Sequence, residues 1–395
     1  MLRMTVVSAV AAFLLTACSE PKEVVVQPKT KSPGQSNELP VPSSDPKALL
    51  GAQLFFDESL SKEGNQSCAT CHDIAHGLAD SREETLYGAV SLGSDLHSIG
   101  TRNTPTASYA AFSPAFHKMS NGEYRGGQFH DGRASSLAEQ AEGPFVNPVE
   151  MALPNSDNVV ARVKKNTRYK DLFDELYGDG ILNDPIKGYA AITDSIATFE
   201  KTAMFMPFDS KYDRALRGEV KLTPEEELGK VLFFSQQFTN CNACHQLNTS
   251  PFHPQETFTN FEYRNIGVPA NPILAAQEGY KADLGLLENP EVSDPKQAGK
   301  FKVPTLRNVA VTGPYMHNGV FQDLRTVVLF YDKYNNPQRT INPETGEEWG
   351  EPEVAENIDF ENLNMGPALK EERVDAIVAF LKTLTDQRYE HLLED

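Results

Sequence analysis

The sequence contains two copies of a frame in which two cysteines, separated by two residues, are followed at once by a histidine. The copies are Cys68-Ala-Thr-Cys71-His72 and Cys241-Asn-Ala-Cys244-His245. This frame is the attachment signature of c-type haem: both thiols bond to one porphyrin and the histidine ligates the iron. The cysteine pairs lie too far apart for a zinc ribbon, whose pairs are about 15–20 residues apart, and a thioredoxin-like pair needs no histidine. We therefore predict two covalent haems, and with them redox chemistry.

The fifth cysteine, Cys18, ends a predicted export signal. Residues 1–18 combine an arginine with an apolar run that is too short to span a membrane. Their end, Leu15-Thr16-Ala17-Cys18, resembles a bacterial lipoprotein box, and a plain secretory signal with an incidental cysteine is the alternative. Ser19 after the cysteine favours the outer membrane. We expect a periplasmic protein with a lipid anchor at Cys18 and a flexible tether over residues 19–46.

The formal net charge of −19 limits the partners. An acidic surface argues against nucleic acid and against direct adhesion to anionic lipid, so a lipid anchor would be the only membrane contact. It allows weak, salt-sensitive docking of a basic electron donor such as a small cytochrome or a cupredoxin. Plain solubility would explain the acidity equally well.

The chain also repeats itself around the two haem motifs. Three matched pairs of segments flank the motifs in the same order: Leu50-Gly51-x-x-Leu54-Phe55-Phe56 with Leu228-Gly229-x-x-Leu232-Phe233-Phe234, His130-Asp131-Gly132 with His317-Asn318-Gly319, and Ile196-x-x-Phe199-x-Lys201-Thr202 with Ile377-x-x-Phe380-x-Lys382-Thr383. Such order indicates duplication of one unit. We predict an all-α fold of two cytochrome c-like helical domains, each with one covalent c-type haem, over residues 47–217 and 218–395.

Helix signals support this class. Thr223-Pro224-Glu225-Glu226 is a capping box with proline at the first helical position. Residues 373–385 carry an apolar stripe at helical spacing, and no alternating segment of convincing strand length is present.

The repeat allows the two irons to be compared. Fourteen residues after His130 stands Pro144, and fourteen after His317 stands Tyr331. Proline offers no side-chain ligand, whereas a tyrosine phenolate can bind haem iron. The second iron would then be closed by His245 and Tyr331, and the first would keep an open face on which peroxide could bind. The alternative interpretation of Tyr331 is a core aromatic residue.

Two polar residues follow in the segment around Pro144. Peroxide cleavage needs a base that moves a proton between the oxygens and a donor that orients the molecule. Glu150 suits the first role and Gln140 the second. Residue type alone would make them a helix-cap glutamate and a surface glutamine, so these roles depend on a family resemblance.

Beyond the haem motifs, a set of further segments resembles the bacterial di-haem cytochrome c peroxidases and the MauG-type enzymes of the same superfamily. The segments are Arg102-Asn103-Thr104-Pro105-Thr106, Phe129-His130-Asp131-Gly132-Arg133-Ala134, Glu139-Gln140-Ala141, Asn147-Pro148-Val149-Glu150-Met151, and Pro304-Thr305-Leu306-Arg307-Asn308-Val309 running on to Pro314-Tyr315-Met316-His317. The match covers nearly everything after Pro46.

The resemblance implies a division of labour between the haems. The first would be the peroxidatic haem, with Gln140 and Glu150 in its distal pocket, and the second would relay electrons. A calcium ion would lie between the domains, bound by the Asn103 side chain and by the carbonyls of Thr312 and Pro314, because hard cations prefer oxygen ligands. Family members are often dimers, so a homodimer is possible.

The chain also departs from the peroxidase pattern. Typical peroxidases carry methionine at the position of Tyr331, whereas MauG-type enzymes carry tyrosine. Both groups usually place tryptophan between the haems, where this chain has His130, which could replace it or bond a haem propionate. The single tryptophan, Trp349, lies in an acidic loop and is expected to be exposed. His97 is a candidate for a removable ligand of the first iron.

Three functions remain open at this point. The leading one is an exported peroxidase that reduces hydrogen peroxide with electrons from a donor protein. The alternative enzyme is a MauG-type oxidase that uses peroxide to oxidise tyrosine or tryptophan of a partner protein. A plain electron carrier with two closed haems is the third, and Gln140, Pro144 and Glu150 argue against it because a carrier needs no open polar pocket.

Overall fold

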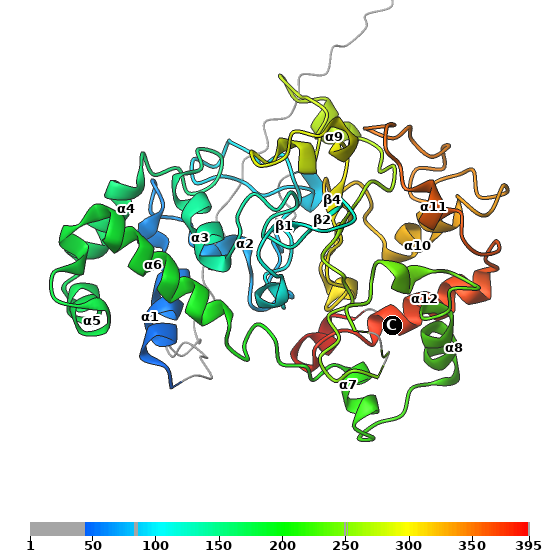
Figure 1. Ribbon diagram of the computed structural model, residues 1–395, viewed down its shortest axis with the longest axis horizontal. Helices are drawn as coiled ribbons and strands as arrows, with labels where there is room; N and C mark the ends of the chain where they lie inside the picture. Colours follow the sequence, from blue (N-terminus) through cyan, green and yellow to red (C-terminus); the bar gives the residue numbers. More distant parts are fainter. Residues whose placement is uncertain (1–43, 83–85, 249, 251, 394–395) are drawn as a thin grey trace, which may run out of the picture. The chain divides into compact units, whose positions relative to one another are not determined.

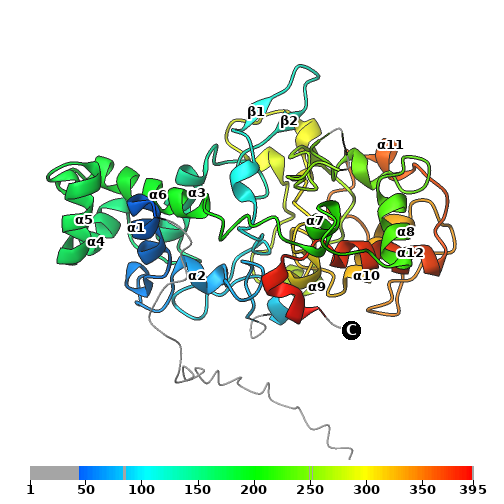
Figure 2. The ribbon, with the colours of Figure 1, turned by 90° about the horizontal axis from the view of Figure 1, so that it is seen from below.

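The computed structural model describes residues 44–82, 86–248, 250 and 252–393, and these belong to one compact unit (Figures 1 and 2). The predicted signal, Cys18 and most of the tether lie outside the described residues. Within the described ranges, no helix has both the length and the apolar character that crossing a membrane would require.

Helices dominate both halves, which confirms the predicted all-α class. The first half contains α1 (Pro46–Phe55), α2 (Cys68–Cys71), α3 (Leu137–Val146), α4 (Ser156–Lys165), α5 (Thr167–Tyr177) and α6 (Pro185–Glu200). The second half contains α7 (Lys211–Leu216), α8 (Pro224–Phe233), α9 (Pro272–Ala275), α10 (Leu324–Asp332), α11 (Phe360–Leu363) and α12 (Glu371–Lys382). The strands of the described part are short antiparallel pairs, β1 (His117–Lys118) with β2 (Tyr124–Arg125) and β3 (Tyr263–Arg264) with β4 (Phe301–Lys302).

The same helix crossing occurs in each half. Helix α1 packs against α6, and α8 packs against α12. A Cβ atom on Gly51 would clash with the Ser195 carbonyl, and one on Gly229 would clash with the Ala376 carbonyl. Glycine is therefore required at both positions because the backbones of the two helices touch there.

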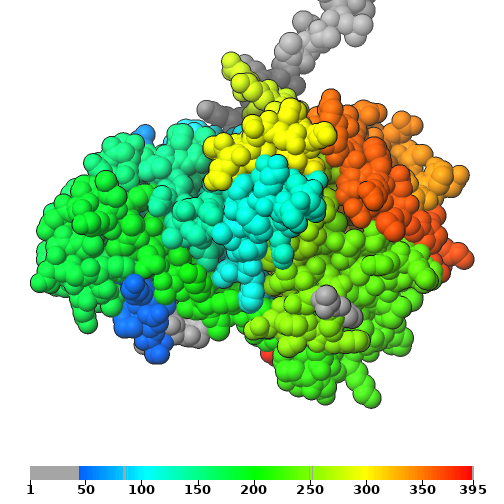
Figure 3. Space-filling model, in the orientation of Figure 1, coloured from blue at the N-terminus to red at the C-terminus, as the bar shows by residue number. Residues whose placement is uncertain are grey.

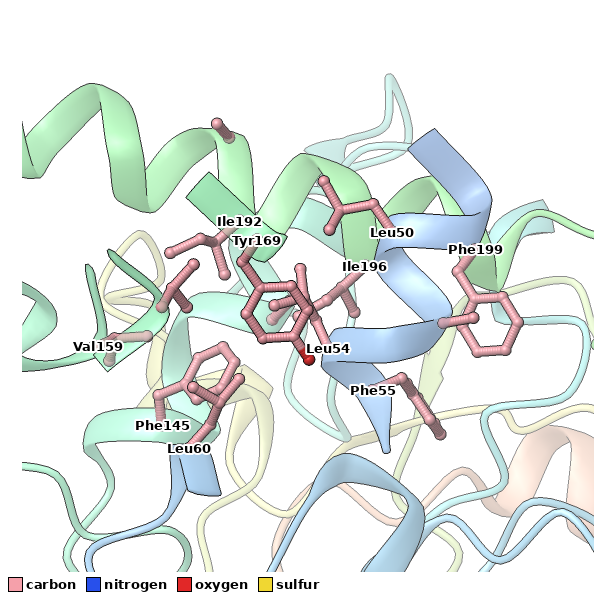
Figure 4. Close-up of a cluster of buried hydrophobic side chains, with 14 of the residues drawn as sticks. Leu50, Leu54, Phe55, Leu60, Phe145, Val159, Tyr169, Ile192, Ile196 and Phe199 are labelled. Carbon is pink, nitrogen blue, oxygen red and sulfur yellow. The ribbon is translucent and has the colours of Figure 1, made fainter. Parts of the chain in front are cut away.

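The aromatic residues of the repeat meet across these crossings. In the first core, Phe55 of α1 contacts Phe199 of α6 with ring centroids 5.4 Å apart (Figure 4). In the second core, Phe233 of α8 and Phe380 of α12 are 5.2 Å apart. These pairs are equivalent in the repeat, so each half builds its core around the same contact. The predicted capping box at Thr223 is present and starts α8.

The turn that contains each repeated histidine also has the same backbone. The residue before the histidine is left-handed in both halves, with φ of 64° at Phe129 and 71° at Met316. A β-bridge closes each turn, between Gln128 and Ala134 and between Tyr315 and Phe321. The agreement supports duplication of one structural unit.

The halves interlock through the loops between their helices. The β1–β2 hairpin abuts the segment near residue 290, cyan against yellow in Figure 3, and Lys300 pairs with Glu123 at 2.8 Å. Helix α7 precedes the predicted boundary at residue 217, yet its Tyr212 packs in the second core. The exact boundary stays a prediction.

Candidate functional site

A cavity of about 390 Å³ lies in the second half and contains all three residues of the second haem motif. Cys241, Cys244 and His245 line it together with Tyr331, and apolar side chains such as Leu381 form much of its wall. Native cores rarely leave apolar space of this size empty. The cavity therefore requires a large, mostly apolar group, and a porphyrin held by two thiols and a histidine fits it.

The two motif histidines are oriented in the same way. Nδ1 of His72 lies 3.1 Å from the Leu78 carbonyl, and Nδ1 of His245 lies 3.2 Å from the Phe258 carbonyl. Nδ1 therefore carries the proton and donates it, which leaves Nε2 free as a metal ligand. Burial lowers the pKa of His245 to about 4, so the ring is neutral, as iron ligation requires.

The four motif cysteines are free thiols here, and in the holoprotein their sulfurs would form the thioether bonds to the haems. Burial raises the pKa of Cys71 and of Cys244 to about 11, so these thiols are protonated before attachment. An arginine accompanies each one. The Arg82 guanidinium lies 3.2 Å from the Cys71 sulfur, and Arg264 acts on Cys244 and lowers its pKa.

The helices after the repeated histidines place Pro144 and Tyr331 in equivalent positions. Helix α3 begins at Leu137 and α10 begins at Leu324, so each of the two residues is the eighth of its helix. Neither half has an inserted residue between its repeated histidine and this helix position, so Pro144 and Tyr331 can be compared directly.

The structure brings Tyr331 to the second haem motif. Tyr331 lines the cavity together with His245. Burial raises the pKa of its phenol, and the negative charges that nearby Cys244 and Cys241 carry when ionised raise it further. The phenol is therefore close to the sulfurs that would hold the porphyrin. Its ligand role remains a prediction, with a geometry that allows it.

The structure likewise brings Glu150 to the first haem motif. Its charge contributes to raising the pKa of both Cys68 and Cys71. Burial raises the pKa of Glu150 itself, while Arg133 and a hydrogen bond with Asn147 oppose the shift. A carboxyl group with a raised pKa can both accept and return a proton near neutral pH.

Gln140 stands on α3 one turn before Pro144. Residues four apart share a helix face, so Gln140 and Pro144 face the same side. Gln140 is half-buried, and its role at the first haem stays a prediction.

His130 comes from the first half but lines the second cavity, as does His317. The Nε2–H of His130 donates to the Asn103 carbonyl at 2.9 Å, and burial lowers the pKa of His130 to about 4. The His317 ring stacks on Phe301 at 3.6 Å. A neutral imidazole from the first half therefore lines the second haem cavity, and its function stays open.

The three predicted calcium ligands also line this cavity. Asn103, Thr312 and Pro314 all line it, and the Asn103 amide nitrogen donates to the Ala89 carbonyl at 3.1 Å, which fixes the side chain. The described residues contain no cluster of three or more His, Cys, Asp or Glu suited to a metal. The predicted set uses amide and carbonyl oxygens instead.

Two sequence expectations about single residues need comment. Trp349 is partly buried rather than exposed, because its ring packs edge-on against Phe321 and Phe330 at 5.8 and 5.7 Å and its Nε1–H donates to the Arg339 carbonyl. His97 is exposed, on a loop whose Ser94 amide donates to the Glu150 carbonyl.

One buried acid escaped the sequence analysis. Glu200, at the end of α6, is 7% exposed, and burial raises its pKa to about 8. Its charge acts on Cys68, so it lies beside the first haem motif. The repeat could have pointed to this residue. It aligns Glu200, which follows Phe199, with the apolar Leu381, which follows Phe380.

Comparisons with known proteins agree with this arrangement. The family model for di-haem cytochrome c peroxidase matches residues 45–221. The methylamine utilization protein MauG of Paracoccus denitrificans is 51% identical over 388 residues, which cover 97% of this chain and 98% of that protein. The cytochrome c peroxidase Ccp of Escherichia coli is 31% identical over 345 residues, 87% of this chain and 59% of that protein.

Among solved structures, the diheme peroxidase BthA from Burkholderia thailandensis superposes with a TM-score of 0.78 at 30% identity, covering 88% of each chain. These relatives are di-haem oxidoreductases, and membership of their family implies two c-type haems, one for each cysteine–histidine motif of this chain. Since the similarity extends over both haem motifs, the chain belongs to the di-haem cytochrome c peroxidase family, which includes the MauG proteins.

Proposed function

We propose that this chain is a MauG-type enzyme, which uses hydrogen peroxide to oxidise tyrosine or tryptophan side chains of a partner protein. The observation that carries the proposal is Tyr331, which lines the second cavity beside Cys241, Cys244 and His245. The extent of similarity to the MauG protein of Paracoccus denitrificans supports the same choice.

Each haem would be held by one cysteine pair and one histidine. When bound, the two haems supply one iron that accepts peroxide and one that exchanges electrons with a protein. Pro144 leaves the first iron without a side-chain ligand from α3, while the equivalent position on α10 presents a phenol.

The residues near the first haem would handle the protons of peroxide. Glu150 would take a proton from one oxygen of peroxide and return it to the other. The amide of Gln140 donates a hydrogen bond that holds the peroxide in the orientation for this transfer. The raised pKa of Glu150 favours the return of the proton, and the opposing effect of Arg133 keeps the carboxylate accessible as a base.

Tyr331, which lines the same cavity as His245, would be a second side-chain ligand of the haem that this site holds. Burial raises the pKa of the phenol, so the side chain stays neutral unless a cation replaces its proton. A ferric iron beside His245 is such a cation, since metal binding removes protons from its ligands. An anionic ligand would stabilise oxidised forms of this site, which suits the oxidation of a distant protein side chain.

Calcium would join the halves at the second cavity. The Asn103 side chain comes from the first half and the Thr312 and Pro314 carbonyls from the second. We place the enzyme in the periplasm, with a lipid anchor at Cys18 and an outer-membrane location as further parts of the proposal. A homodimer is also compatible with the family.

The second candidate is peroxide reduction with electrons from a small cytochrome or cupredoxin. The structural similarity to the diheme peroxidase BthA favours it. The two candidates differ in what the fully ferric protein can do with peroxide before any donor is added.

The test adds hydrogen peroxide to the ferric holoprotein without a donor and follows peroxide consumption. A MauG-type enzyme should consume peroxide and keep oxidising equivalents that a reductant added later can titrate. The variant Tyr331→Met, which carries the ligand type of typical peroxidases, should require prior reduction. The proposal fails if the ferric wild type is inert toward peroxide until one haem is reduced.

A further inference from the structure

Glu200 ends α6 with a carboxyl group that is buried beside the first haem motif. Its Oε2 is buried and has no hydrogen-bond partner. After burial itself, the charge of Glu200 is the strongest influence raising the pKa of the Cys68 thiol. A buried carboxyl group without a full set of partners is unfavourable, so its presence requires a reason other than stability.

The repeat shows that this position faces the haem. Leu381 is the equivalent of Glu200 in the second half, and it lines the second haem cavity. Each half therefore points the residue after its repeated phenylalanine at the porphyrin space. The second half has an apolar leucine there, which suffices for packing. The acid in the first half adds a titratable group that packing does not need.

The charged surroundings leave Glu200 poorly compensated. Lys201, the residue that follows α6, is the cation that acts on it, and that effect is smaller than the effect of burial. The cations on the helices packed against α6 bind other groups than Glu200. Lys47 of α1 donates to Asp194. On α4, Arg162 donates to the carbonyls of Ser59 and Lys62, and Lys164 donates to Asn183. Helix α3 adds the acids Glu139 and Glu142, which are both exposed, and Glu150 lies near the same cysteines.

We propose that Glu200 couples the oxidation of the first haem to the release of a proton. When the haem loses one electron to an oxidant, Glu200 loses one proton to water, and reduction returns both. The positive charge gained by the haem stabilises the carboxylate, as any nearby cation does. The oxidant in the titration is an added one-electron mediator, which takes the electron. The inference requires the first haem but not the proposed protein substrate.

Burial raises the pKa of Glu200 to about 8, which supports the coupling because the acid then holds its proton at neutral pH and can release it on oxidation. The potential of the first haem should fall as the pH rises through this region. One proton per electron corresponds to a tenfold change per pH unit, or about 59 mV.

The experiment is a spectroscopic redox titration of the holoprotein from about pH 6 to about pH 10. In the wild type, the reduction potential of the first haem should fall as the pH rises around the pKa of Glu200, which is about 8. The reduction potential of the second haem should not change over the same range. Glu200→Gln, which keeps the shape, and Glu200→Leu, which copies the second half, should both remove the slope. Glu142→Gln, which makes the same change at an exposed site, should retain it.

Infrared difference spectra of the wild type provide an independent readout that needs no variant to fold. Oxidation of the first haem should remove the carbonyl band of a protonated carboxylic acid. The band should be missing in Glu200→Gln and present in Glu142→Gln. A wild-type potential that is flat across this range, or a slope that survives in Glu200→Gln, would overturn the inference.

Discussion

Replacing Glu150 by glutamine tests the proposed peroxide chemistry. The substitution keeps the size of the side chain and removes its ability to accept a proton. A positioned general base contributes about 10²–10⁴-fold to a rate, so we expect a loss of about 10³-fold in the rate constant for peroxide reaction. This loss equals about 4 kcal/mol of activation free energy.

The structure also predicts the pH dependence and the stability of this variant. Burial raises the pKa of Glu150, so the wild-type rate should increase with pH as the carboxylate forms, from a point above the ordinary range of glutamate. The rate of Glu150→Gln should be flat there. A raised folded-state pKa means that the buried carboxylate lowers stability at pH values above the unfolded pKa, so glutamine should not destabilise the fold at neutral pH.

The assay is stopped-flow mixing of peroxide with the ferric holoprotein under single-turnover conditions. Glu142→Gln on α3 makes the same chemical change at an exposed site and should react like the wild type. The reasoning is refuted if Glu150→Gln reacts within about tenfold of the wild type, or if both variants lose the same activity while keeping both haems.

Three other predictions follow from the same geometry. Tyr331→Phe should open the second site, so the cyanide bound per ferric protein should rise from one to two in an optical titration; an unchanged stoichiometry would speak against ligation. Gly229→Ala should lower the free energy of unfolding by about 1–3 kcal/mol in denaturant titrations, because its methyl group meets the Ala376 carbonyl, and an unaltered midpoint would contradict the close crossing. Removal of calcium with a chelator should lower the melting temperature of the wild type but not that of Asn103→Ala. If the chelator lowered both melting temperatures equally, Asn103 would be rejected as a calcium ligand.

The sequence predicted the elements that repeat, because each signal is local. The capping box at Thr223 and the glycines of the helix crossings act through contacts within one helix or one helix pair. The positions of Pro144 and Tyr331 could also be compared, because both follow the same turn and the helices begin at matched residues.

What the sequence could not predict depends on contacts between distant segments. Trp349 lies in a polar loop, and only the fold brings Phe321 and Phe330 against it. His130 belongs to the first half by sequence, yet it lines the cavity of the second. Glu200 stands on an amphipathic helix and resembles a surface residue until its burial is known.

The most direct test of the account is the electron paramagnetic resonance spectrum of the ferric holoprotein. We predict one high-spin haem, assigned to the site of Pro144 and Glu150, and one low-spin haem that loses its low-spin signal in Tyr331→Phe. Two low-spin haems, or a low-spin signal that persists in this variant, would contradict the claim that one iron is open and the other is capped by a phenol.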